Sequence, residues 1–458
     1  MNQAAICAVT GRQRRFFDTG VTLNISYRAA ALKRLHRAVQ AHEADLAAAL
    51  RQDLGKSRTE SYMCEIGMVL SELRWLRRNL WRLTRDRHVP TPLHQFLSRS
   101  FRRPSPYGVT LIMSPWNYPV LLTLGPLADA LAAGNTAVVK PSAYAPATSQ
   151  LLARLLGSIF PAAYVEVIEG GREANEWLLQ ERFDYIFFTG SPTVGRLVLE
   201  RASKNLTPVT LELGGKSPCI IDSSADLPAA ARKVVFGKFL NCGQTCIAPD
   251  YVLCRESVLE EFLRLLRLEV QRQYGKEYKF NLTYGRIVSK KHFDRLVGLL
   301  DPGKVFLGGS SDKESLRIEP TIMAGVTWDD AVMGEEIFGP ILPVLTYRDT
   351  ADVIATLRSK PKPLALYLFA RDKAVIETIT TRCQFGGGCI NDVIVHLATS
   401  YMPFGGVGES GMGSYHGQAG FDTFTHYKSM GRGGPLDLPM RYQPYTRLSE
   451  KLIRLFLK

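Results

Sequence analysis

The sequence has few cysteines and no long hydrophobic run. Its 458 residues hold 8 cysteines, too few for a disulfide scaffold, and none forms a C-x-x-C pair or stands beside a histidine at zinc-ligand spacing. No apolar run approaches the roughly 18 residues that cross a bilayer, and residues 1–21 lack the apolar core of a secretory signal. We therefore expect no metal site, no membrane span and a cytoplasmic location.

Positive charge is concentrated in the first quarter of the chain. The formal net charge is +14, and residues 1–106 hold 19 Lys or Arg against 8 Asp or Glu, a net +11. Such a balance can mark a surface for nucleic acid or for an anionic membrane. Here the arginines recur on predicted helices, without interleaved aromatic residues and without a run of five like charges. We therefore predict solvated helix faces and no nucleic-acid partner.

Residues 1–106 also carry the helical periodicity of a scaffold. Apolar residues recur near the helical repeat over 28–52 and again over about 61–85, which predicts two amphipathic helices. Prolines then bracket residues 94–103, a stretch too short for a core that predicts a hairpin or an arm projecting from the body. At the other end of the chain, 448–458 predicts a short amphipathic helix packed on the body.

From residue 107 on, short apolar runs alternate with helical periodicity, which predicts βαβ units and a parallel sheet. Predicted strands lie at 109–113, 136–140, 164–168 and 184–189, and predicted helices at 119–133, 147–159, 172–181 and 193–203. The second half repeats the alternation, with strands near 209–213, 218–222, 250–254, 341–346 and 364–369 and helices near 226–240, 256–273, 290–300 and 349–358. We therefore expect an α/β protein with two such domains, although pattern alone does not separate a nucleotide-binding sheet from other doubly wound sheets.

Cys246 ends the run Asn-Cys-Gly-Gln-Thr-Cys at 241–246 and precedes a strand-like stretch. A thiol is a nucleophile when positive charge or backbone N–H groups favour its thiolate, and a glycine-bearing turn lets amides point at the sulfur and at an attacked carbonyl oxygen. Taken alone, a cysteine in such a chain is more often a buried core residue than a nucleophile. The rest of the chain favours the nucleophile.

Gly190, Ser191 and Gly195 belong to Thr-Gly-Ser-Pro-Thr-Val-Gly at 189–195, which follows an apolar strand and opens a helix. The free N–H groups and the dipole of that helix can receive a phosphate. The glycine spacing is not G-x-G-x-x-G, so an ordinary strand-to-helix turn remains open.

Glu212 lies between two leucines, directly before the double glycine of Leu-Glu-Leu-Gly-Gly-Lys. Apolar surroundings favour a neutral carboxyl, which suits a general base that takes a proton from water near neutral pH. The alternative is a glutamate that caps a helix or pairs with Lys216.

Asn117 lies in Ser-Pro-Trp-Asn-Tyr-Pro at 114–119, where the first strand of the sheet is predicted to end. Ligands bind at this edge in doubly wound folds, and an amide donor there can hold a developing oxyanion. The alternative is a cap on the following helix.

Together and in this order, these stretches resemble the aldehyde dehydrogenase superfamily, and within it the class 3 branch of fatty and aromatic aldehyde dehydrogenases. The resemblance runs from about residue 28 to 445. Its motifs are Pro-Trp-Asn-Tyr-Pro at 115–119, Ala-Gly-Asn-Thr-Ala-Val-Val-Lys-Pro-Ser at 133–142, Phe-Thr-Gly-Ser at 188–191, Leu-Glu-Leu-Gly-Gly-Lys-Ser-Pro at 211–218, Gly-Gln-Thr-Cys at 243–246, Glu-Glu-Ile-Phe-Gly-Pro at 335–340 and the glycine-rich run at 403–417.

The resemblance implies two Rossmann-like α/β domains, one coenzyme-binding and one catalytic, with a small β oligomerisation arm. The implied ranges are 1–90 and 107–210 for the coenzyme-binding domain, 211–402 for the catalytic domain, 403–420 for a glycine-rich return segment, 91–106 and 421–445 for the arm, and 446–458 for a C-terminal helix. Class 3 members are typically homodimers, so the resemblance also implies a homodimer, of the soluble rather than the membrane-anchored kind.

The resemblance further implies oxidation of an aldehyde to a carboxylic acid with NAD or NADP. In that reaction the Cys246 thiolate attacks the aldehyde carbon, and the oxyanion is held by the Asn117 side-chain amide and the Cys246 backbone N–H. Hydride passes to the nicotinamide, and Glu212 activates the water that hydrolyses the thioester. The implied cofactor contacts are Lys140 at the adenosine ribose, Gly190 and Ser191 at the diphosphate, and Glu336 and Phe338 at the nicotinamide ribose and ring, with Ser142 and Gly195 as further cofactor-binding residues.

Two positions depart from the family pattern. Relatives commonly carry a glutamate after Lys-Pro-Ser, where it bonds the adenosine ribose and repels a 2′-phosphate, whereas this chain has Ala143. We therefore predict that NADP+ is accepted at least as readily as relatives accept it. Glu409 stands where class 3 members often have asparagine, and the sequence gives no account of its effect.

Three alternative functions remain to be separated by experiment. A coniferyl-type aromatic aldehyde dehydrogenase shares these motifs, and activity on cinnamyl aldehydes would identify it. A cysteine hydrolase or acyl transferase could use Cys246 without a cofactor, and an inactive enzyme fold could act as an adaptor. The physiological aldehyde is not encoded in the motifs.

Overall fold

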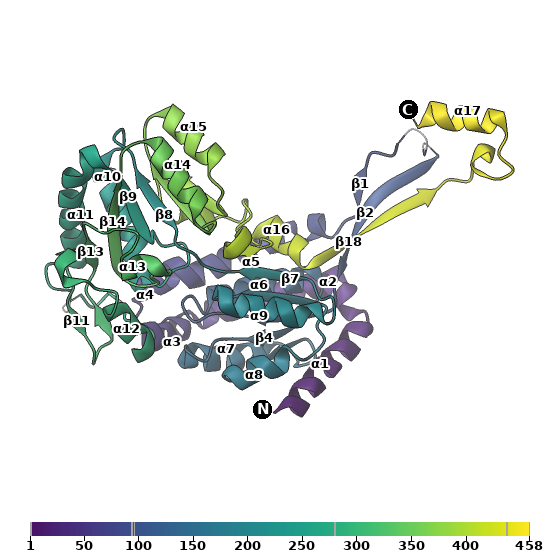
Figure 1. The fold of residues 1–458 in the computed structure, drawn as a ribbon. Helices are drawn as coiled ribbons and strands as arrows, with labels where there is room; N and C mark the ends of the chain where they lie inside the picture. The colour runs from purple at the N-terminus through teal and green to yellow at the C-terminus, as the bar shows by residue number, and fades with distance from the viewer. Residues whose placement is uncertain (1, 93–94, 96, 279–280, 437, 458) are drawn as a thin grey trace.

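Two large, mostly parallel β-sheets flanked by helices make up the body of the described chain, and a slender sheet extends away from them (Figure 1). The computed structural model describes residues 2–92, 95, 97–278, 281–436 and 438–457.

The six-stranded sheet has the strand order of a doubly wound nucleotide-binding fold. Its strands, in spatial order, are β17 (Gly411–Met412), β7 (Val209–Glu212), β6 (Tyr185–Thr189), β3 (Val109–Met113), β4 (Thr136–Lys140) and β5 (Val165–Val167). All neighbours are parallel except β17, which runs antiparallel to β7. The order reverses between β3 and β6, and ligands bind at such a reversal in open α/β sheets. The predicted fold class is confirmed.

Burial explains why these strands read as continuous apolar runs. Every residue of β3, β4 and β6 is buried, because helices cover both faces of the sheet. The helices packed around it are α1 (Gln3–Asp18), α2 (Ile25–Ala41), α3 (Glu43–Leu54), α4 (Arg58–Ser61), α5 (Gly67–Leu83), α6 (Leu121–Ala133), α7 (Pro146–Ile159), α8 (Arg172–Leu178), α9 (Pro192–Ser203) and α16 (Gly417–Thr423).

Both helices predicted before residue 90 are interrupted. The single helix expected over 28–52 is wrong: α2 ends before His42 and α3 starts after it, so that α2 packs against α5 while α3 packs against α7. The helix expected over about 61–85 contains a π-helical turn, Tyr62–Ile66, between α4 and α5. Apolar periodicity continues through both breaks, so it could not locate them.

The seven-stranded sheet fills the second half of the chain. In spatial order its strands are β10 (Val305–Leu307), β13 (Thr321–Met323), β14 (Ile341–Tyr347), β9 (Tyr251–Arg255), β8 (Pro218–Ile221), β15 (Ala365–Phe369) and β16 (Gly387–Ile390), with only β10 antiparallel. Around it lie α10 (Leu227–Phe239), α11 (Leu259–Tyr274), α12 (Lys290–Val297), α13 (Ala331–Gly334), α14 (Thr350–Ser359) and α15 (Lys373–Arg382), together with a small sheet of β11 (Ser311–Asp312) and β12 (Arg317–Ile318). The predicted boundaries between domains stay predictions.

The slender sheet is antiparallel and consists of β1 (Arg87–Val89), β2 (Ser98–Pro106) and β18 (Thr425–Gly433). Strand β18 pairs along the whole of β2, from Thr425 opposite Pro106 to Gly433 opposite Ser98. Residues 98–103 of the predicted hairpin therefore lie in an arm that projects from the body (Figure 1). His94, where the hairpin was predicted to begin, lies outside the described residues.

The prediction that the C-terminal helix packs on the body is wrong. Helix α17 (Arg447–Phe456) lies at the far end of the arm (Figure 1), and none of its described residues is buried. Its Ile453 and Phe456 face the tip of the arm instead, where they line a groove with Leu97 and Leu438.

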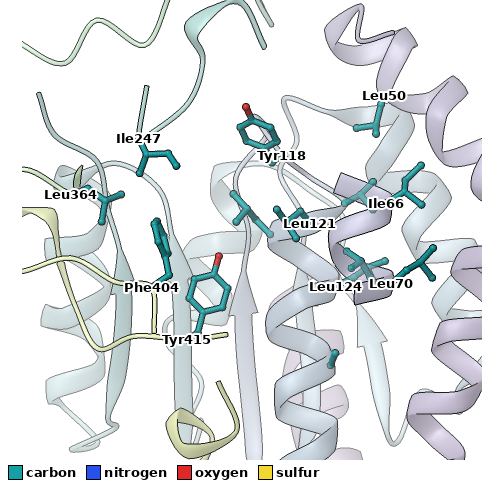
Figure 2. Packing of buried hydrophobic residues seen from close by; sticks show 14 of the residues in the cluster. Leu50, Ile66, Leu70, Tyr118, Leu121, Leu124, Ile247, Leu364, Phe404 and Tyr415 are labelled. Carbon is teal, nitrogen blue, oxygen red and sulfur yellow. The ribbon is translucent and has the colours of Figure 1, made fainter. Parts of the chain in front are cut away.

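A single hydrophobic cluster joins the two large sheets. It includes Leu50, Ile66 and Leu124 from the helices of the first sheet, and Ile247 and Leu364 from the second half of the chain (Figure 2). Because side chains of both halves interdigitate there, the facing edges of the two sheets are held in a fixed relation. None of the helices in the described ranges is long and apolar enough to cross a membrane.

Candidate active site

A cleft of about 740 Å³ opens at the point where the strand order reverses. The loops that follow β3, β6 and β7 form one side of the cleft, and segments from the second half of the chain form the other. Seven of the predicted site residues line it: Asn117, Gly190, Ser191, Glu212, Cys246, Glu336 and Phe338. The structure therefore brings together side chains as far apart in the sequence as Asn117 and Phe338.

Three predicted cofactor residues lie outside the lining of this cleft. Lys140 ends β4 and is buried, with its Nζ 2.7 Å from the carbonyl oxygen of Pro141. Burial lowers the pKa of Lys140 to about 8, while the Glu169 carboxylate acts in the opposite direction. Ser142 Oγ accepts a hydrogen bond from a backbone N–H two residues later, and Gly195 packs under a leucine that itself lines the cleft.

A sharply folded loop presents Cys246 to the cleft. Asn241 and Cys242 adopt left-handed conformations, with φ of 51° and 54°. Gly243 has φ of 73°, and a Cβ there would collide with the carbonyl oxygen of Gly339, so only glycine fits. The Gln244 amide holds the loop in place, because it donates to the carbonyl oxygens of Asn241 and Arg286 and accepts from the Val288 N–H.

Cys246 lies in an environment that keeps its thiol neutral. Burial raises the pKa of the Cys246 thiol, and the Glu336 and Glu212 carboxyl groups act in the same direction. The backbone N–H groups of Cys246 and Ile247 favour the thiolate but are outweighed. Because the thiolate is the nucleophile, a negative charge on this sulfur needs a further source of stabilisation.

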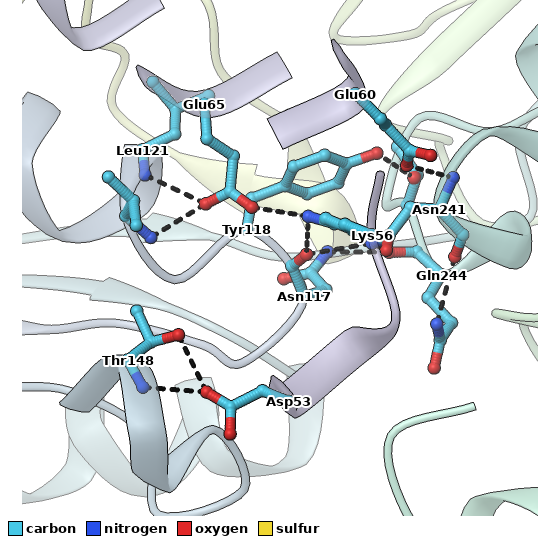
Figure 3. A network of polar contacts seen from close by, with 12 residues as sticks. Asp53, Lys56, Glu60, Glu65, Asn117, Tyr118, Leu121, Thr148, Asn241 and Gln244 are labelled. Carbon is cyan, nitrogen blue, oxygen red and sulfur yellow. Dashed lines mark hydrogen bonds and ion pairs between the residues drawn. The ribbon is translucent and has the colours of Figure 1, made fainter. Parts of the chain in front are cut away.

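Asn117 is buried and its side-chain amide is aimed at the cysteine loop. One Nδ2–H donates to the carbonyl oxygen of Gln244 at 3.0 Å, two residues before Cys246 (Figure 3). The alternative in which Asn117 caps the following helix is wrong, because Glu65 accepts the first N–H groups of α6. Since the amide carries two N–H groups, one remains for an oxygen bound beside Cys246.

Glu212 ends β7, at 2% exposure, with both carboxylate oxygens unpartnered among the residues that the structure describes. Burial alone raises its pKa well above the usual range. The alternative in which Glu212 pairs with Lys216 is wrong, because Lys216 Nζ bonds Asp250 Oδ2 at 2.6 Å. A buried carboxyl that lacks partners is suited to exchange a proton with a bound molecule.

Two glycine-rich turns shape a cradle along the cleft that could hold an extended dinucleotide. Gly190 and Ser191 precede α9, whose first residues Pro192 and Thr193 line the cleft. Pro192 has no N–H and the Val194 N–H donates to Ser191 Oγ, so the Thr193 N–H is the one that this helix end can offer to a phosphate. A Cβ at Gly190 would press on the ring of Phe188, and one at Gly214 would collide with the Glu336 carboxylate. Glycine is therefore required at both positions, because a protein side chain already fills the space that a Cβ would take.

Glu336 and Phe338 form the opposite wall of the cleft. Burial raises the pKa of Glu336 to about 8; the Asp250 carboxylate adds to this, while Lys216 and Lys238 oppose it. Phe338 has a positive φ of 51°, a strained conformation for a bulky residue, and its ring lies 5.4 Å from that of Trp116. Strain of this kind is typical of positions that a binding site holds in place.

Sequence reasoning missed the group that ties the two walls together. Lys216 Nζ donates to the carbonyl oxygens of Val332 and Glu335 at 3.0 and 2.8 Å, in addition to its bond with Asp250. Its position directly after the double glycine was a signal, but nothing in the sequence revealed the partners on the far wall.

Glu409 lies at the rim of the cleft, where its Oε2 is 3.8 Å from Nη2 of Arg196. Both side chains are largely exposed, so the ion pair contributes little to stability.

Comparison with known proteins agrees with this geometry. A model of the aldehyde dehydrogenase family matches residues 3–430, which extends the resemblance to include α1. The chain is 47% identical over 418 residues to 4,4'-diaponeurosporen-aldehyde dehydrogenase of Staphylococcus aureus, covering 91% of each chain. It is 41% identical to aldehyde dehydrogenase family 3 member A2 of Rattus norvegicus, covering 97% of this chain and 93% of the relative.

Solved structures show the same architecture. The substrate-bound state of Staphylococcus aureus AldH superposes with a TM-score of 0.97 at 45% identity and covers 99% of both chains. Members of this family generally use NAD or NADP. The chain belongs to the aldehyde dehydrogenase family, in its class 3 branch, and is an oxidoreductase that acts on the aldehyde group.

Proposed function

We propose that this enzyme oxidises medium- or long-chain aliphatic or aromatic aldehydes to carboxylic acids with NAD+ or NADP+, through a covalent intermediate on Cys246. The observation that carries the proposal is the meeting of Cys246, Glu212 and Asn117 in one cleft at the reversal of the strand order. These three residues supply a nucleophile, a base and an oxyanion donor, the set that acyl chemistry on an aldehyde requires.

In the first step the Cys246 thiol loses its proton to water, the resulting thiolate sulfur bonds to the aldehyde carbon, and the carbonyl oxygen takes up the negative charge. The free Nδ2–H of Asn117 and the backbone N–H of Cys246 stabilise that oxyanion. A nicotinamide held beside Glu336 and Phe338 would supply the acceptor for the hydride of this carbon. The carbon is thereby oxidised and stays attached to Cys246 as a thioester.

Glu212 acts on the thioester as a general base. Its carboxylate takes a proton from water as the water oxygen attacks the acyl carbon, and the sulfur leaves as thiolate. The absence of a hydrogen-bond partner for either oxygen in the described part of the chain supports this role, since nothing there competes with the water.

The cofactor is expected to lie along the cradle from α9 toward Glu336. Gly190 and Ser191 would bind the diphosphate, Lys140 and Ser142 the adenosine ribose, and Glu336 and Phe338 the nicotinamide ribose and ring. We further propose that NADP+ is accepted because the exposed Ala143 presents no carboxylate to a 2′-phosphate.

The substrate is expected to be apolar. The Staphylococcus aureus relative is named for 4,4'-diaponeurosporen-aldehyde, which makes that compound a natural member of a test panel beside alkanals and cinnamyl aldehydes. Preference for cinnamyl aldehydes would favour the coniferyl-type reading instead.

We also propose that the enzyme is a homodimer that forms through the arm. Strand β18 carries mostly exposed residues and occupies an edge of the slender sheet away from the body (Figure 1). An exposed strand edge is a template for pairing with another chain. Light scattering should give twice the mass of 51.0 kDa; a monomer would remove this part of the proposal.

The proposal is tested by following reduced cofactor at steady state with wild type and Cys246→Ala over the aldehyde panel. Wild type should reduce NAD+ or NADP+, and Cys246→Ala should lose at least about 10⁴-fold in rate, as enzymes do without their nucleophile. Cofactor-independent ester cleavage with no aldehyde oxidation would point to a thiol hydrolase.

A further inference from the structure

A lysine, Lys56, lies behind Asn117 and belongs to none of the sequence motifs whose residues line the cleft. Lys56 follows α3 in the loop before α4, and its side chain is fully buried. Its Nζ donates to Glu65 Oε1 at 2.5 Å and to the backbone carbonyl oxygen of Asn117 at 2.8 Å, and lies 4.0 Å from the centroid of the Tyr118 ring (Figure 3). The ammonium group thus has a carboxylate, a carbonyl and a ring face as partners.

Glu65 continues the contact to the start of α6. Its second oxygen accepts from the backbone N–H groups of Val120 and Leu121 at 2.8 and 3.3 Å. The π-helical turn Tyr62–Ile66 contains this glutamate and so delivers it to Lys56. The ion pair therefore holds both ends of the segment from Asn117 to Leu121: Lys56 bonds the Asn117 carbonyl oxygen, and Glu65 accepts from the N–H groups at the start of α6.

The same segment is bonded to the cysteine loop. Asn241 Nδ2 donates to the Asn117 carbonyl oxygen at 2.8 Å, beside Lys56, and the Asn241 N–H donates to Glu60 Oε1 at 2.8 Å. The Tyr118 hydroxyl lies 2.6 Å from Thr245 Oγ1, one residue before Cys246.

We propose that Lys56 is a positioning residue for the oxidation: it fixes the peptide of Asn117 so that the side-chain amide points at the oxygen bound on Cys246. This inference rests on the proposed role of Asn117 as oxyanion donor. Lys56 touches neither substrate nor cofactor, and acts through the Asn117 backbone.

The physical reason lies in how an amide donor is aimed. Two N–H donors, from Lys56 and Asn241, fix the Asn117 carbonyl, and the Gln244 carbonyl fixes one side-chain N–H. Without Lys56 the peptide between Asn117 and Tyr118 loses its charged donor and its ring contact, and it can rotate. A displacement of about 1 Å at a reacting group can cost on the order of 10²-fold in rate.

Two variants test this inference. Lys56→Met removes the ammonium but leaves the Glu65 carboxylate buried without its partner, so it can fail to fold. The double variant Lys56→Met with Glu65→Gln removes both charges, and the glutamine oxygen can still accept the N–H of Val120. The matched control is Lys233→Met, because Lys233 Nζ also bonds a carboxylate and a backbone carbonyl, those of Asp392 and Asn391, outside the residues that line the cleft.

The double variant, as folded enzyme, should show kcat for aldehyde oxidation lower by about 10- to 100-fold, with KM for the aldehyde and affinity for NAD+ changed less than about threefold. The Lys233→Met control should keep the wild-type kcat. A kcat within twofold of wild type in the double variant overturns the inference, as does an equal loss in the control.

A mutant cycle with Asn117→Ala separates positioning from general damage. If Lys56 acts through Asn117, its removal should lower kcat by less than about threefold once Asn117 is alanine, whereas independent structural damage multiplies the two losses and overturns the inference. The proposed function fails differently: Asn117→Ala then retains wild-type turnover, or wild type does not reduce the cofactor. A loss with Asn117→Ala but none with the Lys56 variants refutes only the positioning role.

Discussion

The buried polar groups behind the cleft and those inside it differ in whether they have hydrogen-bond partners. Behind it, the carboxylate of Glu65 and the ammonium of Lys56 are fully buried and satisfied by short hydrogen bonds. Inside it, Glu212 is also deeply buried but has no side-chain partner in the described chain, and burial raises the pKa of the Cys246 thiol. The fold thus satisfies the buried charges of Lys56 and Glu65 behind the cleft and leaves Glu212 without a side-chain partner in the described residues.

This difference has an energetic meaning. A satisfied buried network is rigid and fixes one arrangement of its members, whereas an unsatisfied buried group costs roughly 1–3 kcal/mol, which a bound molecule can recover. In this account Glu212 keeps its hydrogen-bonding capacity for water at the thioester.

The largest loss of activity is expected when the Glu212 carboxylate is removed from the cleft. Glu212→Gln should lower kcat by about 10²- to 10⁴-fold, because the hydrolytic water loses its base. The measurement is steady-state reduction of NAD+ or NADP+, with Glu409→Gln at the rim as the control. A kcat near that of wild type would remove Glu212 from the mechanism.

The pH dependence of kcat and kcat/KM tests whether Glu212 and Cys246 act in their ionised forms. Burial raises the pKa of Glu212 and of Cys246, and each works only in its ionised form, so the fraction of active enzyme grows as pH rises. We expect kcat and kcat/KM of wild type to increase from pH 6 toward pH 9. In Glu212→Gln the rise in kcat should flatten while that in kcat/KM, which reports the free enzyme, persists through Cys246. A profile that falls over this range would contradict the assignment.

Asn117→Ala comes next in size. Loss of an oxyanion donor costs on the order of 10²- to 10³-fold in kcat, and the alanine keeps the backbone carbonyl that Lys56 and Asn241 hold. Circular dichroism and Tm should therefore stay close to wild type. Near-normal turnover would show that another group stabilises the oxyanion.

Stability should respond in opposite directions in the two regions. Lys56→Met leaves the buried Glu65 carboxylate without its cationic partner and should lower the free energy of unfolding by roughly 3–5 kcal/mol. Glu212→Leu replaces an unpartnered carboxyl by an apolar group of similar size and should be neutral or stabilising by about 1–2 kcal/mol. Thermal denaturation at one scan rate compares the two, and a lower Tm for Glu212→Leu would show that Glu212 has an unseen structural role.

The smallest expected effect concerns the cofactor. Ala143→Glu restores the family carboxylate and should shift the ratio of kcat/KM toward NAD+ by about tenfold, equivalent to one hydrogen bond gained or one phosphate repelled. Ala143→Gln, which adds the same bulk without charge, is the control. An unchanged ratio would place the 2′-phosphate away from residue 143.

The sequence predicted most of the sheet strands because buried parallel strands are continuous apolar runs. It missed α1, whose buried face includes Thr10 and Gln13 and therefore lacks an apolar stripe. It also missed β17, two residues of the glycine-rich segment, where Gly411 pairs opposite Glu212. Such short pairings depend on the close approach of two backbones, and this leaves no periodic pattern.

The cleft residues were predictable because their motifs are dense and specific. The ion pair of Lys56 and Glu65 behind them was not predictable. Glu65 lies on a helical turn whose apolar periodicity continues undisturbed, and Lys56 lies in the short loop between α3 and α4, so both read as ordinary surface charges. Their burial follows from the π-helical turn and from the packing of α3, α5 and α6. Long-range partners of this kind follow from tertiary structure alone.

The most direct test of the central claim is the mass of the covalent intermediate. Glu212→Gln is mixed with one equivalent of aldehyde and cofactor, quenched in acid, digested and analysed by mass spectrometry. The account predicts that the acyl group is found on Cys246, with none on the neighbouring Cys242, and that about one equivalent of reduced cofactor accompanies it. Reduced cofactor without an acyl group on Cys246 would contradict the claim that this cysteine carries the reaction.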